Sequence, residues 1–296
     1  MIPIRPLSEC GIIPSPYDMR DLKFTTAKFG APNPATLPRE GLGRVPISIE
    51  DQEATNFCTA GVSNASEYQE GVPLSWDFQV AAISRLKGEQ IFGGCDPRTA
   101  LQSPCAYGSL EEAESFYKLA THGAAFISNW QVWSPAQWES AKKHRKASFL
   151  WVRDGNDKFD NIRSALALGK EEGQVVMAFG RWYENWNYVD TDGMIPPPQG
   201  RYTLHFFIFY DWGVVNGREV LKAQLSSGKK FGDGGTVYFE RDTINQVWAD
   251  VHYSSDGIAL AMFKDASETD IERMKEERLS LMEILAEIIK RLLARV

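Results

Sequence analysis

The segment "EDQEATNFCTAGVSNASEYQEG", residues 50–71, places a glutamine six positions before a cysteine and continues with small residues at a helical spacing. We expect a helix to begin near Cys58, directly after a polar loop. Three roles are open to a cysteine in this position: a packing residue, one half of a disulfide, or a nucleophile. A nucleophilic cysteine must be a thiolate, and a helix N-terminus together with a nearby imidazolium favours that form.

Composition sets the class of protein. The 296 residues are 43% hydrophobic and 24% charged, which is typical of a soluble globular chain with one large domain or two lobes. The net charge of −7, without any basic cluster, argues against nucleic acid as the main partner. No apolar run is long enough to span a membrane. The first residues lack the apolar core of a signal peptide, so we expect synthesis in the cytoplasm.

The four cysteines predict neither a disulfide scaffold nor a metal site. They are too few for the former, and their spacing does not fit zinc, so we expect no metal and no cofactor. Cys95 and Cys105 leave two alternatives open, a bridge or two separate thiols, and we expect the thiols.

The chain changes character along its length. Residues 1–48 are rich in proline and glycine, which predicts an arm laid over the body of the protein. Helical periodicity then predicts helices within 58–86, 95–108, 109–120 and 160–173, the last of them capped by Asp160. Runs of β-branched and aromatic residues predict strands at 174–182, 202–213, 218–227 and 236–245. Helices followed by strands indicate an α+β fold with a helical lobe and a sheet lobe.

The last segment, residues 266–296, predicts an amphipathic helix with apolar residues at spacings of three and four from Ile271 to Leu292. Such a helix needs a partner surface. Docking on its own body, self-association through residues 267–296 and binding to a membrane surface are the alternatives, and the mixed charges on its polar face weaken the third.

Among the histidines, His205 is the candidate base for Cys58. It lies in the apolar strand "YTLHFFIFYDWG", where an imidazole is commonly a packed core residue. However, it follows Cys58 by 147 residues, and papain-type enzymes place their histidine about 130–150 residues after the cysteine.

At this point the chain resembles the papain-like cysteine peptidases, in the form found in divergent bacterial and phage members. "EDQEATNFCTA" resembles the family's Asp-Gln-Gly…Cys segment, which implies that Gln52 and the backbone N–H of Cys58 form an oxyanion hole. "IFGGCDPRTALQ" resembles the glycine-containing substrate segment, so Gly93 and Gly94 are the expected substrate-binding residues. "SSGKKFGDGGTVYF" resembles the closing motif, and the resemblance covers roughly residues 35–255.

The sequence also departs from the family pattern. Glu53 replaces the glycine after Gln52, and Phe206 replaces the small residue after the histidine. The asparagine that orients the imidazole falls on Leu225, so we expect the neighbouring amide of Gln224 to take that role. The motif tryptophan becomes Ser227, which removes a shield over the imidazole.

The resemblance implies a two-lobe papain-like fold: an arm at 1–48, a papain-like domain at 49–265 with lobes of about 49–158 and 159–265, and the terminal helix. It implies a thiol hydrolase that cleaves peptide bonds, with Cys58, His205, Gln52 and Gln224 as the catalytic set and a peptide or protein as substrate. The alternatives are a structural papain-fold protein with weak or lost catalysis, in a particle such as a phage tail or baseplate, and a thiol acyltransferase. Because 57 residues precede Cys58, we expect no standard zymogen.

Overall fold

The computed structural model describes residues 12, 23–24, 31–152, 157–248 and 259–264. The chain divides into two compact units, Met1–Phe263 and Lys264–Val296. The amphipathic helix predicted at 266–296 lies outside the described residues, so that helix, its self-association and the predicted domain boundaries stay predictions. Within the described ranges, no helix combines the length and the apolar character needed to cross a membrane.

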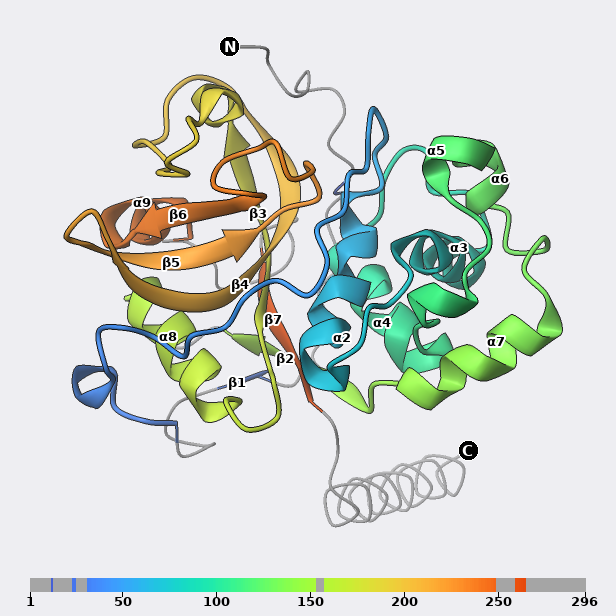
Figure 1. The fold of residues 1–296 in the computed structure, drawn as a ribbon, viewed down its shortest axis with the longest axis horizontal. Coiled ribbons are helices and arrows are strands. Elements are labelled where there is room, and N and C mark those ends of the chain that lie inside the picture. The colour runs from blue at the N-terminus through green and yellow to red at the C-terminus, as the bar shows by residue number, and fades with distance from the viewer. Residues whose placement is uncertain (1–11, 13–22, 25–30, 153–156, 249–258, 265–296) are drawn as a thin grey trace, which may run out of the picture. The chain divides into compact units, whose positions relative to one another are not determined.

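Helices dominate the first half of the first unit, as predicted (Figure 1). A 3-10 turn, η3 (Cys58–Gly61), runs without a break into α2 (Val62–Glu70), so Cys58 is the first residue of one continuous helical segment. The other helical elements of this half are α3 (Trp76–Lys87), α4 (Pro97–Tyr107), η4 (Glu112–Glu114), α5 (Leu119–His122), α6 (Ala124–Ile127), α7 (Pro135–Ala141) and η5 (Lys142–His144).

Local signals in the sequence determine where α3 and α4 begin and end. The Ser75 hydroxyl accepts a hydrogen bond from the N–H of Phe78 at the start of α3. The Asp96 carboxylate caps α4 in the same way, and Pro97 takes the first helical position, as predicted. Gly88 ends α3 in the left-handed conformation that glycine adopts readily.

The prediction of a helix at residues 109–120 is wrong. Only the short turn η4 and the first residues of α5 are helical in this segment, and its start pairs with the chain that follows α2. Leu74 and Glu111 form an antiparallel bridge, and the N–H of Ser75 donates to the carbonyl of Leu110 at 2.7 Å. Leu110 is fully buried, so tertiary packing overrides the helical propensity of the glutamates around it.

The second half of the unit is built on a seven-stranded sheet with the order β1-β2-β7-β3-β4-β5-β6. Neighbours from β7 to β6 are antiparallel, whereas β1 and β2 are parallel. The α+β class is therefore confirmed. The predicted strands are present as β3 (Val176–Tyr183), β4 (Tyr202–Val215), β5 (Arg218–Gln224) and β6 (Thr236–Glu240), and the sequence analysis missed β1 (Lys23–Phe24), β2 (Ser148–Val152) and β7 (Ala259–Lys264).

Two boundaries in this half differ from the prediction. The cap of the helix predicted from residue 160 is Asp157, whose carboxylate accepts from the N–H of Asp160 at 3.0 Å. Asp160 instead lies in the first turn, where its carboxylate binds Arg241 at 2.9 Å. The second part of the strand predicted at 236–245 is helical. The helical elements here are α8 (Lys158–Leu168), η6 (Glu184–Tyr188) and α9 (Arg241–Val247).

Aromatic rings fill the core on one face of β4. The ring of Phe207 stacks on that of Phe239 with centroids 5.4 Å apart, and Trp248 meets Phe207 edge-on at 5.5 Å. Because side chains alternate along a strand, His205 points to the same face as Phe207 and Phe209. The candidate base therefore stands at the end of a continuous aromatic core.

The chain between residues 31 and 52, here called the strap, crosses the sheet half before it reaches Cys58 (dark blue in Figure 1). It includes the short turn η2 (Pro34–Thr36) and is held by buried groups of β4. The indole N–H of Trp212 donates to the carbonyl of Pro38 at 2.7 Å. The fully buried carboxylate of Asp211 accepts from the N–H of Leu42 at 2.7 Å and binds Lys222 at 3.3 Å.

Farther along the strap, Arg44 donates to carbonyls directly after the end of α8, those of its C-cap Gly169 at 3.2 Å and of Lys170 at 3.1 Å. A cation at a helix C-terminus offsets the partial negative charge of the exposed carbonyls. The described part of the predicted arm, residues 31–48, therefore lies over the body at fixed points.

Ser48 joins the strap to both halves of the unit. Its hydroxyl lies 2.9 Å and 2.8 Å from the two carboxylate oxygens of Glu67 in α2. Its carbonyl accepts from the side-chain amide of Gln224 in β5 at 2.6 Å, and the Gln224 oxygen accepts from the hydroxyl of Tyr68 at 2.8 Å. Four residues thus tie the helical half, the strap and the sheet together.

Two carboxyl groups at this junction have raised pKa values. Burial raises the pKa of Glu67 to about 7, against the opposing effect of its bond to the N–H of Leu74. Burial, together with the negative charges of Glu112 and Asp77, raises the pKa of Glu50 to about 7. Both groups bind protons more tightly in the folded protein than in the unfolded chain.

We therefore expect the protein to lose stability as the pH rises. A carboxyl group whose pKa is higher in the folded state stabilises the fold most below its ordinary pKa, and this contribution is lost between about pH 4.5 and pH 7. The expected fall in the free energy of unfolding is about 1–3 kcal/mol for each group. Urea titrations at pH 5 and pH 8 measure it.

The double variant Glu50→Gln/Glu67→Gln should reduce the difference in the free energy of unfolding between pH 5 and pH 8. Glu70→Gln is the matched control, because bonds to Lys146 and His144 outweigh burial and lower the pKa of Glu70. Removal of the Glu70 carboxylate should leave the fall in the free energy of unfolding between pH 5 and pH 8 unchanged. A double variant with the same pH dependence as the unaltered protein would contradict the assignment.

Candidate active site

The structure brings the start of the η3 helical segment against the strand that carries His205. A Cβ atom built on Gly61 would lie 2.6 Å from Cε1 of the Phe206 ring. The first turn after Cys58 therefore packs directly on β4, beside the residue that follows His205. Cys58 is fully covered and His205 is 3% exposed, so both side chains are buried. Because side chains alternate along a strand, His205 faces the opposite side of β4 from Phe206.

The loop with Gln52 pairs with the segment that follows β5. Asp51 and Ser227 form an antiparallel bridge, and the N–H of Gln52 donates to the carbonyl of Ser226 at 3.0 Å. One step farther, the N–H of Gly228 donates to the carbonyl of Glu50 at 2.9 Å. The two motifs that the sequence analysis placed 174 residues apart are thus neighbours, joined by backbone hydrogen bonds.

The side-chain amide of Gln52 is held in one orientation. Its oxygen accepts from the hydroxyl of Ser226, and its nitrogen donates to the carbonyl of Thr55 at 2.6 Å. A primary amide nitrogen carries two hydrogens, and the bond to Thr55 uses one of them. The second is the hydrogen that an oxyanion would need.

Glu53 keeps the conformation of the glycine that it replaces. Its φ is +51°, in the left-handed region that glycine adopts without penalty and other residues seldom adopt. The N–H of Glu53 donates to the carboxylate of Asp51 at 2.9 Å, which stabilises the turn. The turn after Gln52 is therefore retained in spite of the substitution.

The predicted substrate segment lies next to this loop. The side-chain amide of Asn56 donates to the carbonyl of Phe92 at 2.9 Å. Gly93 is exposed, and a Cβ atom built there would meet open space, whereas Gly94 needs its positive φ of 91°. Beyond it, the backbone of Cys95 forms a parallel bridge with Ile12 of the N-terminal arm.

The described cysteines are thiols and form no disulfide, so Cys95 and Cys105 are separate, as expected. Cys95 is fully buried, and burial raises the pKa of its thiol well above the ordinary range. Cys105 is half-buried. Among the described residues, no group of His, Cys, Asp and Glu side chains could hold a metal ion.

Gln224 does not lie with the other predicted site residues. In the sheet it faces Ile208, three positions along β4 from His205, and its amide binds Tyr68 and Ser48. Leu225 is buried. Gln224 therefore belongs to the junction between the halves, and we do not retain the orienting role expected for it.

Trp182 is the neighbour of His205 that the sequence analysis missed. The centroids of the indole and imidazole rings lie 5.6 Å apart at an interplanar angle of 70°. In the register of β3 and β4, Gly180 faces His205, and Trp182 is two positions away on the same face of the sheet. Only this pairing register identifies the contact, because the residues are far apart in sequence.

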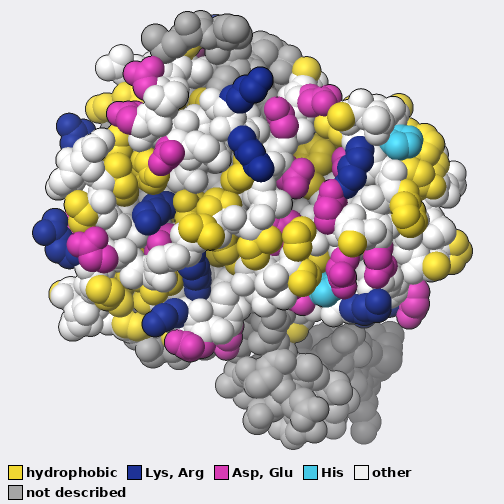
Figure 2. Space-filling model, viewed as in Figure 1, with side chains coloured by type: hydrophobic (Ala, Val, Ile, Leu, Met, Phe, Trp, Pro, Cys, Tyr) yellow, Lys and Arg dark blue, Asp and Glu magenta, His cyan; other side chains and the backbone are white. Residues whose placement is uncertain are grey.

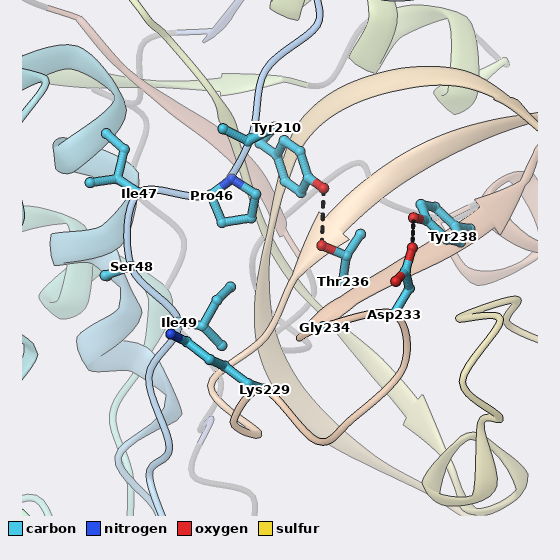
Figure 3. Close-up of a pocket in the computed structure, with 11 residues that line it drawn as sticks. Pro46, Ile47, Ser48, Ile49, Tyr210, Lys229, Asp233, Gly234, Thr236 and Tyr238 are labelled. Atoms are coloured by element: carbon cyan, nitrogen blue, oxygen red, sulfur yellow. Dashed lines mark hydrogen bonds between the residues drawn. The ribbon is translucent and has the colours of Figure 1, made fainter.

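A pocket of about 360 Å³ lies between the strap and the sheet half (Figure 3). Pro46, Ile47 and Ile49 line one wall, and on the other the hydroxyl of Tyr238 donates to Asp233 at 2.6 Å. Apolar side chains also gather on this face of the molecule (Figure 2). The strap that leads to Gln52 is thus open to solvent on the side of this pocket.

Solved structures with a similar fold are cysteine proteases and their precursors. Xylellain, a cysteine protease from Xylella fastidiosa, aligns with a TM-score of 0.67 and 20% identity over 89% of this chain and 98% of that one. A recombinant stem bromelain precursor aligns at 0.57 and 17%, over 88% of this chain and 78% of its own. Digestive procathepsin L 3 from Tenebrio molitor aligns at 0.55 and 14%, over 87% and 76%.

No protein-family model and no curated protein matches the chain by sequence. At these identities the structural similarity establishes the fold. The chain has the papain-like cysteine protease fold, as the sequence predicted.

The contact between Gly61 and Phe206 gives a test of this geometry. Gly61 has an ordinary φ of −57°, so a Gly61→Ala change adds only the collision with the Phe206 ring. We expect it to lower the free energy of unfolding by about 1–3 kcal/mol through overpacking. Because Phe206→Leu makes room, the double variant should lose less stability than the two single variants together. Urea unfolding measures all four proteins, and strictly additive losses would show that the two residues do not touch.

Proposed function

We propose that this protein is a thiol hydrolase that cleaves peptide bonds, with Cys58 as nucleophile and His205 as general base and then acid. The packing of the η3 turn, which begins at Cys58, on β4, the strand that carries His205, is the observation that supports the proposal most strongly. The fold it shares with cysteine proteases supports it.

In the first step, the Cys58 sulfur attacks the carbonyl carbon of the scissile bond as a thiolate, while His205 holds the proton taken from the thiol. The tetrahedral intermediate bears a negative oxygen, which accepts hydrogen bonds from the backbone N–H of Cys58 and the amide of Gln52. Collapse breaks the C–N bond, and His205 gives its proton to the leaving amine. A thioester on Cys58 remains.

In the second step, His205 removes a proton from water, and the hydroxide formed attacks the thioester carbon. The same oxyanion contacts stabilise the second intermediate. Collapse breaks the C–S bond, releases a carboxylic acid and returns the thiol. Ser226 and Thr55 act on both steps through Gln52, because they fix the direction of its amide.

We further propose that the substrate is a peptide or protein whose backbone runs past Gly93. The open space above this exposed residue, and the bond from Asn56, two residues before Cys58, to Phe92, support this proposal. The side chains that a substrate must present, the self-association of the chain, its cytoplasmic synthesis and its incorporation in a virion stay predictions.

A papain-fold protein without strong catalysis is the second candidate. The complete burial of Cys58 favours it, because a nucleophile must meet its substrate. The bridge between Ile12 and Cys95 also lies along the segment that a substrate would use.

Alkylation of Cys58 distinguishes the two candidates. In the hydrolase, iodoacetamide at near-neutral pH should label Cys58 at least tenfold faster than Cys95 or Cys105, because the thiolate is the reactive form. Peptide mapping by mass spectrometry gives the rate for each cysteine. His205→Ala should abolish the preference for Cys58. Slow labelling shared by all the cysteines would support the structural role instead.

Gln52→Ala should lower kcat for peptide cleavage by roughly 10²–10³, the usual loss when one oxyanion donor is removed. Ser226→Ala should have a smaller effect in the same direction, since it frees the amide to rotate. Ser227→Ala is the matched control, as its neighbour's bond to Gln52 remains. Steady-state kinetics with a fluorogenic peptide measure all three. Equal losses of kcat in the Ser226 and Ser227 variants would show that the hydrogen bond from Ser226 to Gln52 does not position the amide for catalysis.

A further inference from the structure

The indole of Trp182 and the imidazole of His205 are in ring contact. The ring centroids are 5.6 Å apart, and the angle of 70° sets the edge of one ring toward the face of the other. Trp182 is 4% exposed and His205 is 3% exposed, so little water reaches the space between them. Any rotation of the imidazole must take place against this indole.

The indole itself is fixed from several sides. Its N–H donates to the side-chain oxygen of Asn187 in η6 at 2.7 Å, and both residues are buried. Trp186 meets it edge-on at 5.3 Å, and Phe231 of the closing segment lies 5.9 Å away. A side chain with a hydrogen bond at its far end and rings on two sides keeps one rotamer.

The sheet register leaves room for the contact. Gly180 faces His205 across β3 and β4 and has no side chain to occupy that space. A Cβ atom on Gly180 would lie 2.4 Å from the ring of Trp248, so a side chain there would collide with the core. The indole of Trp182, two residues along the strand, therefore reaches the imidazole.

We infer that Trp182 is a positioning residue for His205. It holds the imidazole in one orientation and keeps water from one side of it. The inference rests on the proposed function, because His205 matters for turnover only in the hydrolase. Trp182 touches neither the sulfur nor the scissile bond in this mechanism, and it acts through His205.

From the positioning role we also expect the indole to affect the charge of the imidazole. A cation within about 6 Å of an aromatic ring is stabilised by the negative face of that ring. Replacement of Trp182 by leucine keeps an apolar neighbour but removes this attraction, so the imidazolium should lose its proton at lower pH. Replacement by phenylalanine keeps a ring but loses the bond to Asn187, so its effect should be smaller.

Histidine NMR tests the inference without any need for activity. In protein labelled with ¹⁵N-histidine, the resonances of His205 are identified by their loss in His205→Ala. Trp182→Leu should lower the titration midpoint of His205 by roughly half to one pH unit, and Trp182→Phe by less. In the active enzyme, Trp182→Leu should lower kcat by roughly ten- to a hundredfold through misplacement of the base, with KM within about twofold.

Trp133→Leu is the matched control. Trp133 is equally buried, its indole N–H also donates to a carbonyl, that of Ile127, and it packs among rings of the helical half. The Trp133→Leu change should lower the melting temperature of the protein and leave the titration midpoint of His205 unchanged. The inference is overturned if the titration midpoint of His205 is unchanged in Trp182→Leu, or if Trp133→Leu shifts this midpoint equally. If Trp182→Leu does not fold, an unchanged His205 midpoint in Trp182→Phe overturns it.

The two proposals fail separately. A titration of His205 that depends on Trp182, without selective labelling of Cys58, refutes the hydrolase and leaves the positioning contact established. Selective labelling of Cys58, together with a titration midpoint of His205 that does not change when Trp182 is replaced, refutes the positioning role alone.

Discussion

The close approach of Gly61 to the ring of Phe206 is the contact on which the arrangement of this protein depends. It brings the first turn of a helical segment onto a strand without an intervening side chain, and only a glycine allows that distance. The helical segment that begins at Cys58 and the strand that carries His205 pack on each other as a result. A bulky residue at 206 fits beside a buried helix start because its neighbour at 61 is glycine.

His205 lies at the margin of the aromatic core of the sheet half. Its face of the sheet continues into Phe207, Phe209 and the rings around them, which bury large apolar areas and stabilise the sheet. A histidine at the margin of such a core gains a fixed position but little contact with water. The polar part of the site comes from the other side, through the pairing of Gln52 with Ser226.

Much of this architecture could be predicted from the sequence, because periodicity and caps identified α3, α4, α8 and the strands from β3 to β6. The motif around Gln52 and Cys58 also gave the fold correctly. The helix expected at 109–120 could not be excluded, since its backbone partners lie at Leu74 and Ser75 and leave no local signal. Gln224 and Trp182 show the same limit at the site. The first is engaged by Tyr68 and Ser48 and the second reaches His205 only through strand register, and neither relation appears in a linear pattern.

The strap has a consequence for how this chain could vary over evolution. Surface connections ordinarily accept insertions and deletions with little penalty. Between the anchor at Arg44 and the amide at Gln52, however, the backbone is pinned at Ser48 and again at Glu50. One added or lost residue shifts an extended chain by about 3.3 Å, more than the length of a hydrogen bond. Homologous chains that keep these hydrogen bonds should therefore conserve the number of residues in the segment even where they exchange the side chains that make none of them.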